Sequence, residues 1–292
     1  MSASNDIQAA FDRIAGVYDG HAALEQEVGK RLLSRTVFNQ LEPGQILDLG
    51  CGTGECSTAL KNSFRKANVT GLDFSPAMLE QSRRKPKLMR PVRFVCGDMS
   101  RLPLADESLD MVFSNLANYW STDPPRLYAE VRRVLRKDGM FLFSTLGPGS
   151  LSQLREVWAT VDEAVEVPWF ADILEVGDAL AAAGFAEPAM DADRITLEYS
   201  NVESMMEELE STGTGLLVKG GDTWRTRSQE LAEAWKPLMS GEKYPLTFEI
   251  IYGAAFGPSE GQPRKTADGD VVTISVSSLL KSRPLAMINL GK

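Results

Sequence analysis

The chain has 292 residues, of which 43% are hydrophobic and 24% charged, and its formal net charge is −9. These values fit one large α/β domain or two small ones. The acidic balance argues against general nucleic-acid binding, and the sequence contains no apolar run of the roughly 18–20 residues that a membrane span needs. The first residues, MSASNDIQAAF, carry no basic or apolar region of the secretion-signal type, so we expect no such signal.

Cysteine and histidine are rare. The three cysteines are odd in number and lack the spacing of zinc ligands, and free thiols fit a reducing compartment, so we expect a cytoplasmic protein. The single histidine, His21, excludes a histidine-rich metal site, and we expect no bound metal. His21 is also the sole histidine that could act as a base, although an exposed position on a helix is the simpler interpretation.

The first half of the sequence predicts alternating helices and strands. Residues 7–42 predict an N-terminal helical segment that Pro43 and Gly44 end, and a later helix starts at the capping residue Ser75. Five strands are predicted, at residues 46–49, 68–73, 92–96, 109–114 and 140–145. This alternation predicts a Rossmann-like, doubly wound α/β fold whose sheet is mostly parallel.

The second half is less regular. Helices are predicted at about residues 150–163 and 175–184, and a strand at 194–200. Residues 201–240 predict a helical insert over the active site, and residues 244–257 a long, antiparallel late strand. We therefore interpret residues 1–257 as one domain with a lid at 7–42. We interpret the remainder, residues 258–292, as a tail whose first part is polar and mobile. Residues 271–280 of this tail are either an edge strand or disordered.

The segment ILDLGCGTGECSTAL, residues 46–60, predicts a strand, a glycine turn and a helix that begins beside a ligand. Its glycines fall as G-x-G-x-G, and Glu55 stands where the third glycine of a dinucleotide fingerprint belongs. A carboxylate at that place repels a pyrophosphate. The predicted ligand is therefore nucleotide-like but not anionic at this point.

Acidic residues follow the predicted strands at the edge where parallel sheets bind ligands. Asp73 ends the second strand, where a carboxylate accepts two ribose hydroxyls, and Asp98 with Met99 follows the third, where the pair fits an adenine. Asp48 and the glycine turn suit an ammonium group. A nucleoside that carries positive charge and no phosphate fits all of these positions.

Together, LDLGCGTG, the acidic end of the second strand followed by SPAML, and GDMSRLPLADESLDMVFSN resemble the motifs of class I S-adenosylmethionine-dependent methyltransferases. Four motifs occur in the family's order and spacing over about residues 40–145. The resemblance implies S-adenosyl-L-methionine as the cofactor. It implies these cofactor-binding residues: Asp48, Gly50, Gly52, Gly54, Asp73, Phe74, Met78, Asp98, Met99 and Asn115.

A longer resemblance covers about residues 9–257. AAFDRIAGVYDGHAALEQEVGKRLL, SNLANYW, ITLEYSNVESMMEELESTGTG and YPLTFEIIYG are similar to the malonyl-acyl-carrier-protein O-methyltransferase family of biotin synthesis. That resemblance implies methylation of the free carboxylate of a malonyl thioester and an acyl carrier protein as partner; it indicates no oligomeric state. The sequence departs from the family pattern at Pro168-Trp169, which replaces a common Asn-Arg, and at Glu210, which replaces a position that is often basic.

The implied reaction needs no general base, because carboxyl groups titrate near pH 4 and the substrate is already ionised. Tyr18, on the lid, and Asn115, after the fourth strand, are the residues we expect to orient the substrate. Tyr119 and Trp120 either border the methyl site or belong to the core, and Cys51 is expected to pack rather than react. Two other functions stay open: methylation of another small acid or a phenol, and a non-catalytic scaffold that binds the cofactor.

An acidic carrier protein needs a basic docking surface. The basic run at residues 83–93 is expected to be a solvated loop. We expect the helix that starts at Ser75 to end at the sheet edge opposite the active site, so that the first residues of the basic run lie there. Arg136 and Lys137 are expected at the same opposite edge. Arg126 begins its helix on the correct edge. We therefore predict that the carrier contacts are Arg126, Lys219, Arg225 and Arg227.

Overall fold

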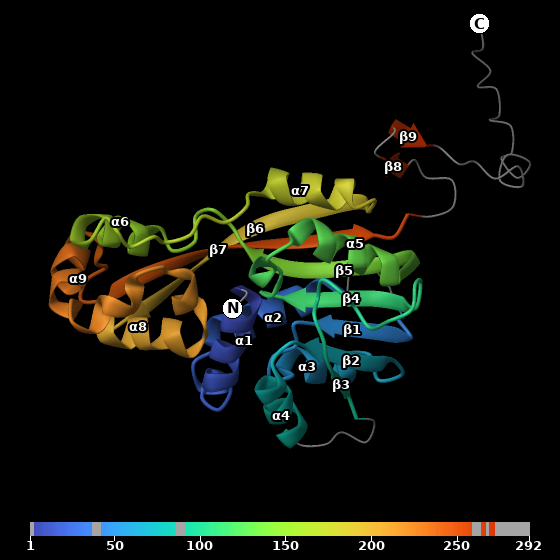
Figure 1. Cartoon of the computed structure of the whole chain (residues 1–292), viewed down its shortest axis with the longest axis horizontal. Helices are drawn as coiled ribbons and strands as arrows, with labels where there is room; N and C mark the ends of the chain where they lie inside the picture. Colours follow the sequence, from blue (N-terminus) through green and yellow to red (C-terminus); the bar gives the residue numbers. More distant parts are fainter. Residues whose placement is uncertain (1–2, 37–41, 86–90, 259–263, 267–268, 272–292) are drawn as a thin grey trace, which may run out of the picture.

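A seven-stranded sheet forms the centre of the computed structural model (Figure 1), which describes residues 3–36, 42–85, 91–258, 264–266 and 269–271. The strand order is β3-β2-β1-β4-β5-β7-β6. Strand β7 runs antiparallel to both β5 and β6, and the other neighbours are parallel, which confirms the predicted mostly parallel sheet with an antiparallel late strand. The strands are β1 (Gln45–Leu49), β2 (Asn68–Asp73), β3 (Arg93–Cys96), β4 (Leu109–Asn115), β5 (Leu135–Leu146), β6 (Ala186–Tyr199) and β7 (Tyr244–Phe256).

Helices cover both faces of this sheet. Strand β1 alternates its side chains, so Ile46 joins the core beneath α2 (Ala23–Ser34) and α3 (Glu55–Ser63), whereas Leu47 and Leu49 join the core beneath α5 (Pro124–Val134) and α7 (Ile173–Ala182). Strand order reverses around β1, which pairs with β2 on one side and β4 on the other. The carboxyl end of β1 therefore opens on the crevice where such folds bind ligands.

The N-terminal segment lies across that crevice. Helix α1 (Ala3–Ile14) and the short η1 (Tyr18–Gly20) precede α2, so the predicted lid is broken into three pieces. Phe11 of α1 clusters with Met78 of α4 (Pro76–Arg84), and Gln8 donates a hydrogen bond of 2.8 Å to the Phe74 carbonyl. Residues 37–41 of the predicted lid lie outside the described residues.

The long strands β6 and β7 extend beyond the rest of the sheet, and helices surround this extension (Figure 1). Trp158 and Trp235 are fully buried there, and Gly213 approaches Phe11 so closely that an added Cβ would lie 3.0 Å from its ring. The insert therefore contacts the lid. Its elements, with the preceding helix, are α6 (Ser152–Val161), α8 (Val202–Ser211), η4 (Thr214–Leu217), η5 (Gly221–Arg225), α9 (Ser228–Trp235) and η6 (Lys236–Leu238).

Two strands and the predicted tail differ most from their predicted bounds. Strand β5 begins at Leu135, directly after α5, because Leu135 pairs with Leu109 before the register shifts. Strand β6 begins eight residues earlier than predicted and follows β7 along its length. In the predicted tail, β8 (Arg264–Thr266) and β9 (Gly269–Val271) form an antiparallel pair, and residues 272–280 of the proposed edge strand lie outside the described residues.

Within the described residues, no helix combines the length and the apolar character that crossing a membrane requires.

Candidate active site

The glycine turn after β1 has a backbone that other residues adopt only with strain. Gly50, Gly52 and Gly54 have φ of 71°, 51° and 79°, the left-handed region that glycine enters without steric cost. A Cβ on Gly50 would lie 2.3 Å from the Cβ of Ala117, so a side chain there would also collide with the loop after β4. The turn thus leads the chain tightly from β1 into α3.

Asp73 holds this turn in place from the end of β2. Its carboxylate accepts one hydrogen bond from the Gly52 backbone N–H and one from the Ser75 backbone N–H, each 2.8 Å long. Burial raises the pKa of Asp73 to about 6, although these backbone hydrogen bonds oppose the shift. The carboxylate is therefore fixed at the strand end where a ribose was expected.

A cavity of about 590 Å³, here called the β3 cavity, opens beside the loop that follows β3. Gly50 and Asp73 line it, so it begins at the glycine turn. Trp120, on η3 (Asn118–Trp120), also lines it and packs against Phe11 of the lid at 5.0 Å between ring centroids. Its lining further includes Phe74, Asp98, Met99, Ser100 and Arg126.

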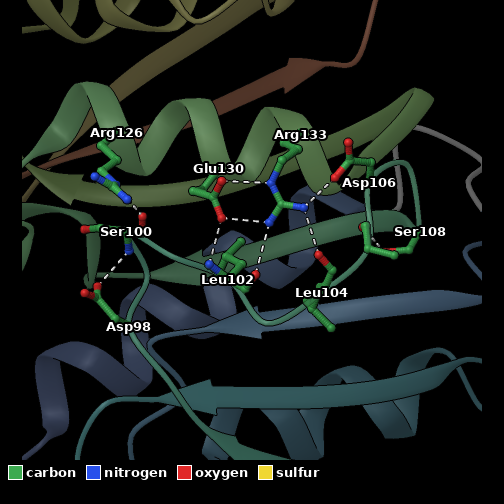
Figure 2. A network of polar contacts seen from close by, with 10 residues as sticks. Asp98, Ser100, Leu102, Leu104, Asp106, Ser108, Arg126, Glu130 and Arg133 are labelled. Carbon is green, nitrogen blue, oxygen red and sulfur yellow. Dashed lines mark hydrogen bonds and ion pairs between the residues drawn. The ribbon is translucent and has the colours of Figure 1, made fainter.

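Helix α5 fixes the loop that carries Asp98 and Met99 (Figure 2). The Arg133 guanidinium donates to the carbonyls of Leu102 (3.0 Å) and Leu104 (2.8 Å), and Glu130 accepts a hydrogen bond of 2.8 Å from the Leu102 backbone N–H. The Arg133 hydrogen bond to Glu130 lowers the pKa of that carboxyl, which keeps it ionised. The loop is thus held by charge-assisted contacts to one helix.

Arg126, one of the predicted carrier contacts, belongs to the same arrangement. Its Nε donates a hydrogen bond of 2.9 Å to the Ser100 carbonyl, and the Ser100 backbone N–H donates one of 2.8 Å to Asp98 (Figure 2). Arg126 therefore lies at the wall of the β3 cavity and helps to position Asp98.

A second cavity, of about 110 Å³, lies between α2 and the glycine turn and is here called the α2 cavity. Gly50 lines both cavities, so they meet at the turn. The side chains of three predicted site residues, Tyr18, Asp48 and Asn115, line it. The structure thus brings these residues together beside the predicted site residues that line the β3 cavity: Gly50, Asp73, Phe74, Asp98, Met99 and Arg126.

Asp48 is buried at the end of β1 and accepts a hydrogen bond of 2.5 Å from the Ser57 hydroxyl of α3. Burial raises its pKa to about 7, and the nearby Asp73 charge adds to that shift. Burial also raises the pKa of the Cys51 thiol well above its usual value. A neutral, buried thiol is a poor nucleophile, which supports the packing role expected for Cys51.

Glu25, in the first turn of α2, is a residue of the α2 cavity that sequence reasoning missed. Its Oε2 is buried without a hydrogen-bond partner, and burial raises its pKa to about 7. A signal existed: Leu24, Val28 and Leu32 form the buried stripe of α2, and Glu25 borders that stripe four residues before Gly29. A charged residue beside a buried stripe and a glycine indicates a cavity.

Asn115 ties α2 to the sheet. Its Nδ2 donates a hydrogen bond of 2.9 Å to the Glu25 carbonyl, and its Oδ1 accepts one of 2.9 Å from the Ser144 hydroxyl. The amide therefore has a structural task at the cavity wall. Tyr119 packs against the main core and Phe170, whereas Trp120 reaches the β3 cavity, so the two aromatic residues that sequence left undecided have different places.

Met78 and Gly54 contribute from outside the cavities. Met78 is buried with Phe11 and Ala15 beneath the lid and lines neither cavity, because α4 begins at Pro76 and turns this side chain inward. Gly54 is the residue before α3, and a Cβ there would lie 3.0 Å from Phe94. Both residues therefore contribute through packing outside the cavities.

The chain is similar to known methyltransferases along most of its length. A family model described as "Methyltransferase domain" matches residues 47–143. A malonyl-[acyl-carrier protein] O-methyltransferase from Laribacter hongkongensis is 40% identical over 90% of this chain and 92% of its own length. A second protein of that name, from Gallionella capsiferriformans, is 38% identical over 91% of this chain and 94% of its own.

The chain belongs to the malonyl-[acyl-carrier protein] O-methyltransferase family. The predicted methyltransferase identity and its cofactor, S-adenosyl-L-methionine, are thereby confirmed. Among solved structures, the methyltransferase in complex with the Trm112 activator of Haloferax volcanii has a TM-score of 0.55 at 23% identity, covering 85% of this chain and 97% of that one. That likeness agrees with the Rossmann-like fold.

The prediction that α4 carries its end to the far edge of the sheet is wrong. Lys85 directly follows α4, and its ammonium lies 3.0 Å from the Asp19 carboxylate of η1, 3.2 Å from the Thr53 hydroxyl and 3.3 Å from the Glu55 carboxylate. Thr53 and Glu55 stand at the glycine turn, so the end of the nine-residue α4 lies within reach of the carboxyl end of β1. Residues 86–90 of the basic run lie outside the described residues.

Three other cations predicted to meet the carrier lie on or beside the insert of this methyltransferase, and each pairs with an acid. Lys219 lies 3.2 Å from Glu166, and its side chain is 79% exposed. Arg225 forms an ion pair of 2.5 Å with Glu210 and is 60% exposed. Arg227 is only 27% exposed, because it bridges to Asp162 and to the Val161 carbonyl.

The two positions that we expected to depart from the family pattern, Glu210 and Trp169, both make local contacts. Glu210 accepts hydrogen bonds from Trp224 (2.7 Å) and Arg225, so an acid there joins α8 to η5. Trp169 is 74% exposed, and its ring stacks on the Arg155 guanidinium at 3.8 Å. Neither residue lines the α2 cavity.

Proposed function

We propose that the protein methylates the free carboxylate of a malonyl thioester held by an acyl carrier protein, an early step of biotin synthesis. The observation that carries this proposal is the junction of the β3 and α2 cavities at Gly50, in a chain whose relatives bear the name of that reaction. A cofactor in the first cavity and a small acid in the second would meet at the glycine turn. Residues 1–257 would act as one methyltransferase domain.

The residues of the β3 cavity fit the cofactor's nucleoside. The Asp73 carboxylate is buried and held by two backbone N–H groups, which leaves its remaining lone pairs to accept ribose hydroxyls. Asp98 and Met99 line the cavity where an amine and a ring would lie. S-adenosyl-L-methionine supplies a methyl group on a positively charged sulfonium, and Asp48 and the turn would hold its amino-acid end.

The chain supplies alignment rather than proton transfer. Its single histidine, His21, lies outside both cavities, and a malonyl carboxylate is ionised without a base. Holding two reacting groups in line contributes about 7–11 kcal/mol in favourable cases. Tyr18 and Asn115 would orient the substrate, and the buried wall of the α2 cavity would exclude water while opposite charges cancel.

The carrier would dock beside the insert. Lys219, Arg225 and Arg126 are exposed, and Arg227 is the least exposed of the three predicted contacts on the insert. Such exposed cations would attract an acidic protein before contact. We place the reaction in the cytoplasm, in keeping with the free thiols of Cys51, Cys56 and Cys96.

A direct assay tests the proposed function. The protein is incubated with methyl-labelled S-adenosyl-L-methionine and with malonyl carrier protein, malonyl-CoA, a short malonyl thioester, a succinyl thioester and a phenol. We expect label in the malonyl thioesters as a methyl ester that mild alkali releases as methanol. Label only in the phenol, or only in another acid, would show that the proposed substrate is wrong. Cofactor binding without methyl transfer to any of these compounds would indicate a non-catalytic scaffold.

A further inference from the structure

The Glu25 side chain is held in a fixed place in the α2 cavity. Its own carbonyl accepts the Asn115 hydrogen bond of 2.9 Å, which anchors the start of α2 to β4. Gly29, one turn later, lets α2 pack closely against α3 and β4, because a Cβ there would lie 2.7 Å from the Cys56 sulfur and 3.3 Å from Asn115 Nδ2. Both Glu25 and Gly29 line the α2 cavity.

Glu25 Oε2 is buried, and no hydrogen bond reaches it from the described part of the chain. Buried polar atoms in native proteins nearly always have a partner, and an exception in the wall of a cavity can be explained by a bound molecule or by a catalytic role. The missing partner of Glu25 is therefore expected to come from a bound molecule.

The groups around Glu25 are mostly neutral or acidic. Three tyrosines lie near enough to interact with it: burial raises the pKa of Tyr18 on η1, Tyr119 on η3 and Tyr199 on β6, and the charge of Glu25 adds to each shift. Glu208 of α8 raises the Glu25 pKa further and accepts a hydrogen bond of 2.7 Å from Tyr199. The other titratable groups that line the cavity are Asp19, Asp48, Cys51, Glu55 and Cys56, and Lys85 pairs with Asp19 and Glu55. The cation among the cavity's lining residues is Lys30, which is exposed on the outer side of α2.

This composition is unfavourable for an anionic substrate if Glu25 is ionised. With Asp48 assigned to the cofactor's amino-acid end, a malonyl carboxylate that enters the α2 cavity meets the Glu25 carboxyl in a poorly solvated space where like charges repel strongly. One proton on Glu25 changes the repulsion into a short, charge-assisted hydrogen bond.

We propose that Glu25 is a substrate-binding residue that keeps its proton and donates it in a hydrogen bond to the malonyl carboxylate. The inference rests on the proposed function and deepens it, because it supplies the group that grips the acid. One substrate oxygen accepts the hydrogen bond, and the other attacks the sulfonium methyl. The carbon–sulfur bond breaks as the carbon–oxygen bond forms, the electron pair stays on sulfur, and the proton remains on Glu25.

The electrostatics of the site agree with this role. Burial raises the pKa of Glu25 to about 7, and the Glu208 charge raises it further, whereas its backbone hydrogen bond acts in the opposite direction. The donor is thus present below about pH 7 and is lost above it. The affinity for the acid should follow that titration.

The test compares wild type with Glu25→Gln, which has the same shape and donates a hydrogen bond at every pH. The ratio kcat/KM for a short malonyl thioester is measured from about pH 6 to 8.5 at saturating S-adenosyl-L-methionine. Wild type should lose about tenfold per pH unit above its midpoint, and Glu25→Gln should show no such decline. Glu27→Gln, on the same helix but paired with Arg31 at the surface, is the matched control and should follow wild type.

Cofactor affinity, measured by calorimetry at each pH, separates Glu25 from Asp48 and Asp73, which titrate in the same range. A flat wild-type profile, or the wild-type slope in Glu25→Gln, would overturn the inference while leaving the proposed function intact. So would a loss of cofactor affinity in Glu25→Gln, or a KM that rises only in Lys30→Gln. Absence of any methyl ester at every pH with wild type would instead refute the proposed function.

Discussion

The β3 and α2 cavities share Gly50 but treat their acidic groups differently. In the β3 cavity the carboxylates of Asp73 and Asp98 accept backbone hydrogen bonds from neighbouring turns. In the α2 cavity Glu25 has an unpartnered oxygen, and burial raises its pKa and that of Asp48 to about 7. Backbone donors stabilise an ionised carboxylate, which can accept hydrogen bonds from hydroxyls and amines. A carboxyl that burial keeps neutral can instead donate a hydrogen bond to an anion. The comparison separates a nucleoside site from an acid site within one crevice.

The largest effect is expected from removing the principal carboxylate of the β3 cavity. Asp73→Ala should weaken S-adenosyl-L-methionine binding roughly ten- to hundredfold, since hydrogen bonds to charged groups contribute about 1.5–3 kcal/mol. Isothermal titration calorimetry measures the change. Glu80→Ala, on the exposed side of the neighbouring α4, is the control. An unchanged dissociation constant for Asp73→Ala would show that Asp73 does not bind the ribose.

The buried carboxyl of Glu25 in the α2 cavity should make the free energy of unfolding of the ligand-free protein depend on pH. The folded-state pKa of Glu25 is raised from 4.5 to about 7, so folding is favoured by the protonated form and loses stability as pH rises between these values. The stability advantage of Glu25→Gln over wild type should therefore grow by about 2 kcal/mol from pH 5 to pH 8. Urea unfolding at both pH values measures it, and an advantage that is equal at the two would contradict the buried, titrating carboxyl.

A smaller effect should distinguish the two cavities by kinetics. Tyr18→Phe removes one hydroxyl from the α2 cavity and should lower kcat up to about tenfold, the range of a single neutral hydrogen bond. The dissociation constant of the cofactor should stay nearly the same. If both quantities fall together, Tyr18 belongs to the cofactor site and the boundary between the cavities must be redrawn.

The smallest effect concerns the carrier outside both cavities. The pair Lys219→Gln and Arg225→Gln should raise KM for malonyl carrier protein about two- to fivefold at low salt, in line with exposed charges, and leave a short thioester unaffected. The effect should fade as salt rises, because screening acts over about 8 Å at 0.15 M.

The matched pair Arg83→Gln and Arg84→Gln tests the docking face. Arg83 contacts the Phe94 carbonyl, and Arg84 pairs with Glu80, beside the end of α4. Because α4 ends near the glycine turn, this pair is no longer remote from the site, as Lys85 shows. A higher carrier KM in this pair alone would move the docking face from the insert to α4.

Much of the cofactor side of the site was predictable because its signals are local. A strand that ends in a glycine turn must begin the next helix at the sheet's edge, and Asp73 and Asp98 follow their strands by necessity of topology. The direction of α4 was not predictable in this way. Its position depends on tertiary contacts that no local signal carries, such as the packing of Met78 with Phe11 of the lid and the ion pairs of Lys85 at the glycine turn.

The sequence by itself determined the sheet, the glycine turn and the acidic residues at the strand ends, because each depends on neighbours within one strand–turn–helix unit. The tertiary structure alone decided that the Oε2 of Glu25 is buried while Glu27, two residues later, pairs with Arg31 at the surface. The Asn115 hydrogen bond ties the start of α2 to β4, and the charge of Glu208, more than 180 residues away in the chain, adds to the rise in pKa that burial causes at Glu25. A charged side chain carries no local mark of its burial; the desolvation that shifts its pKa comes from distant elements that pack against it.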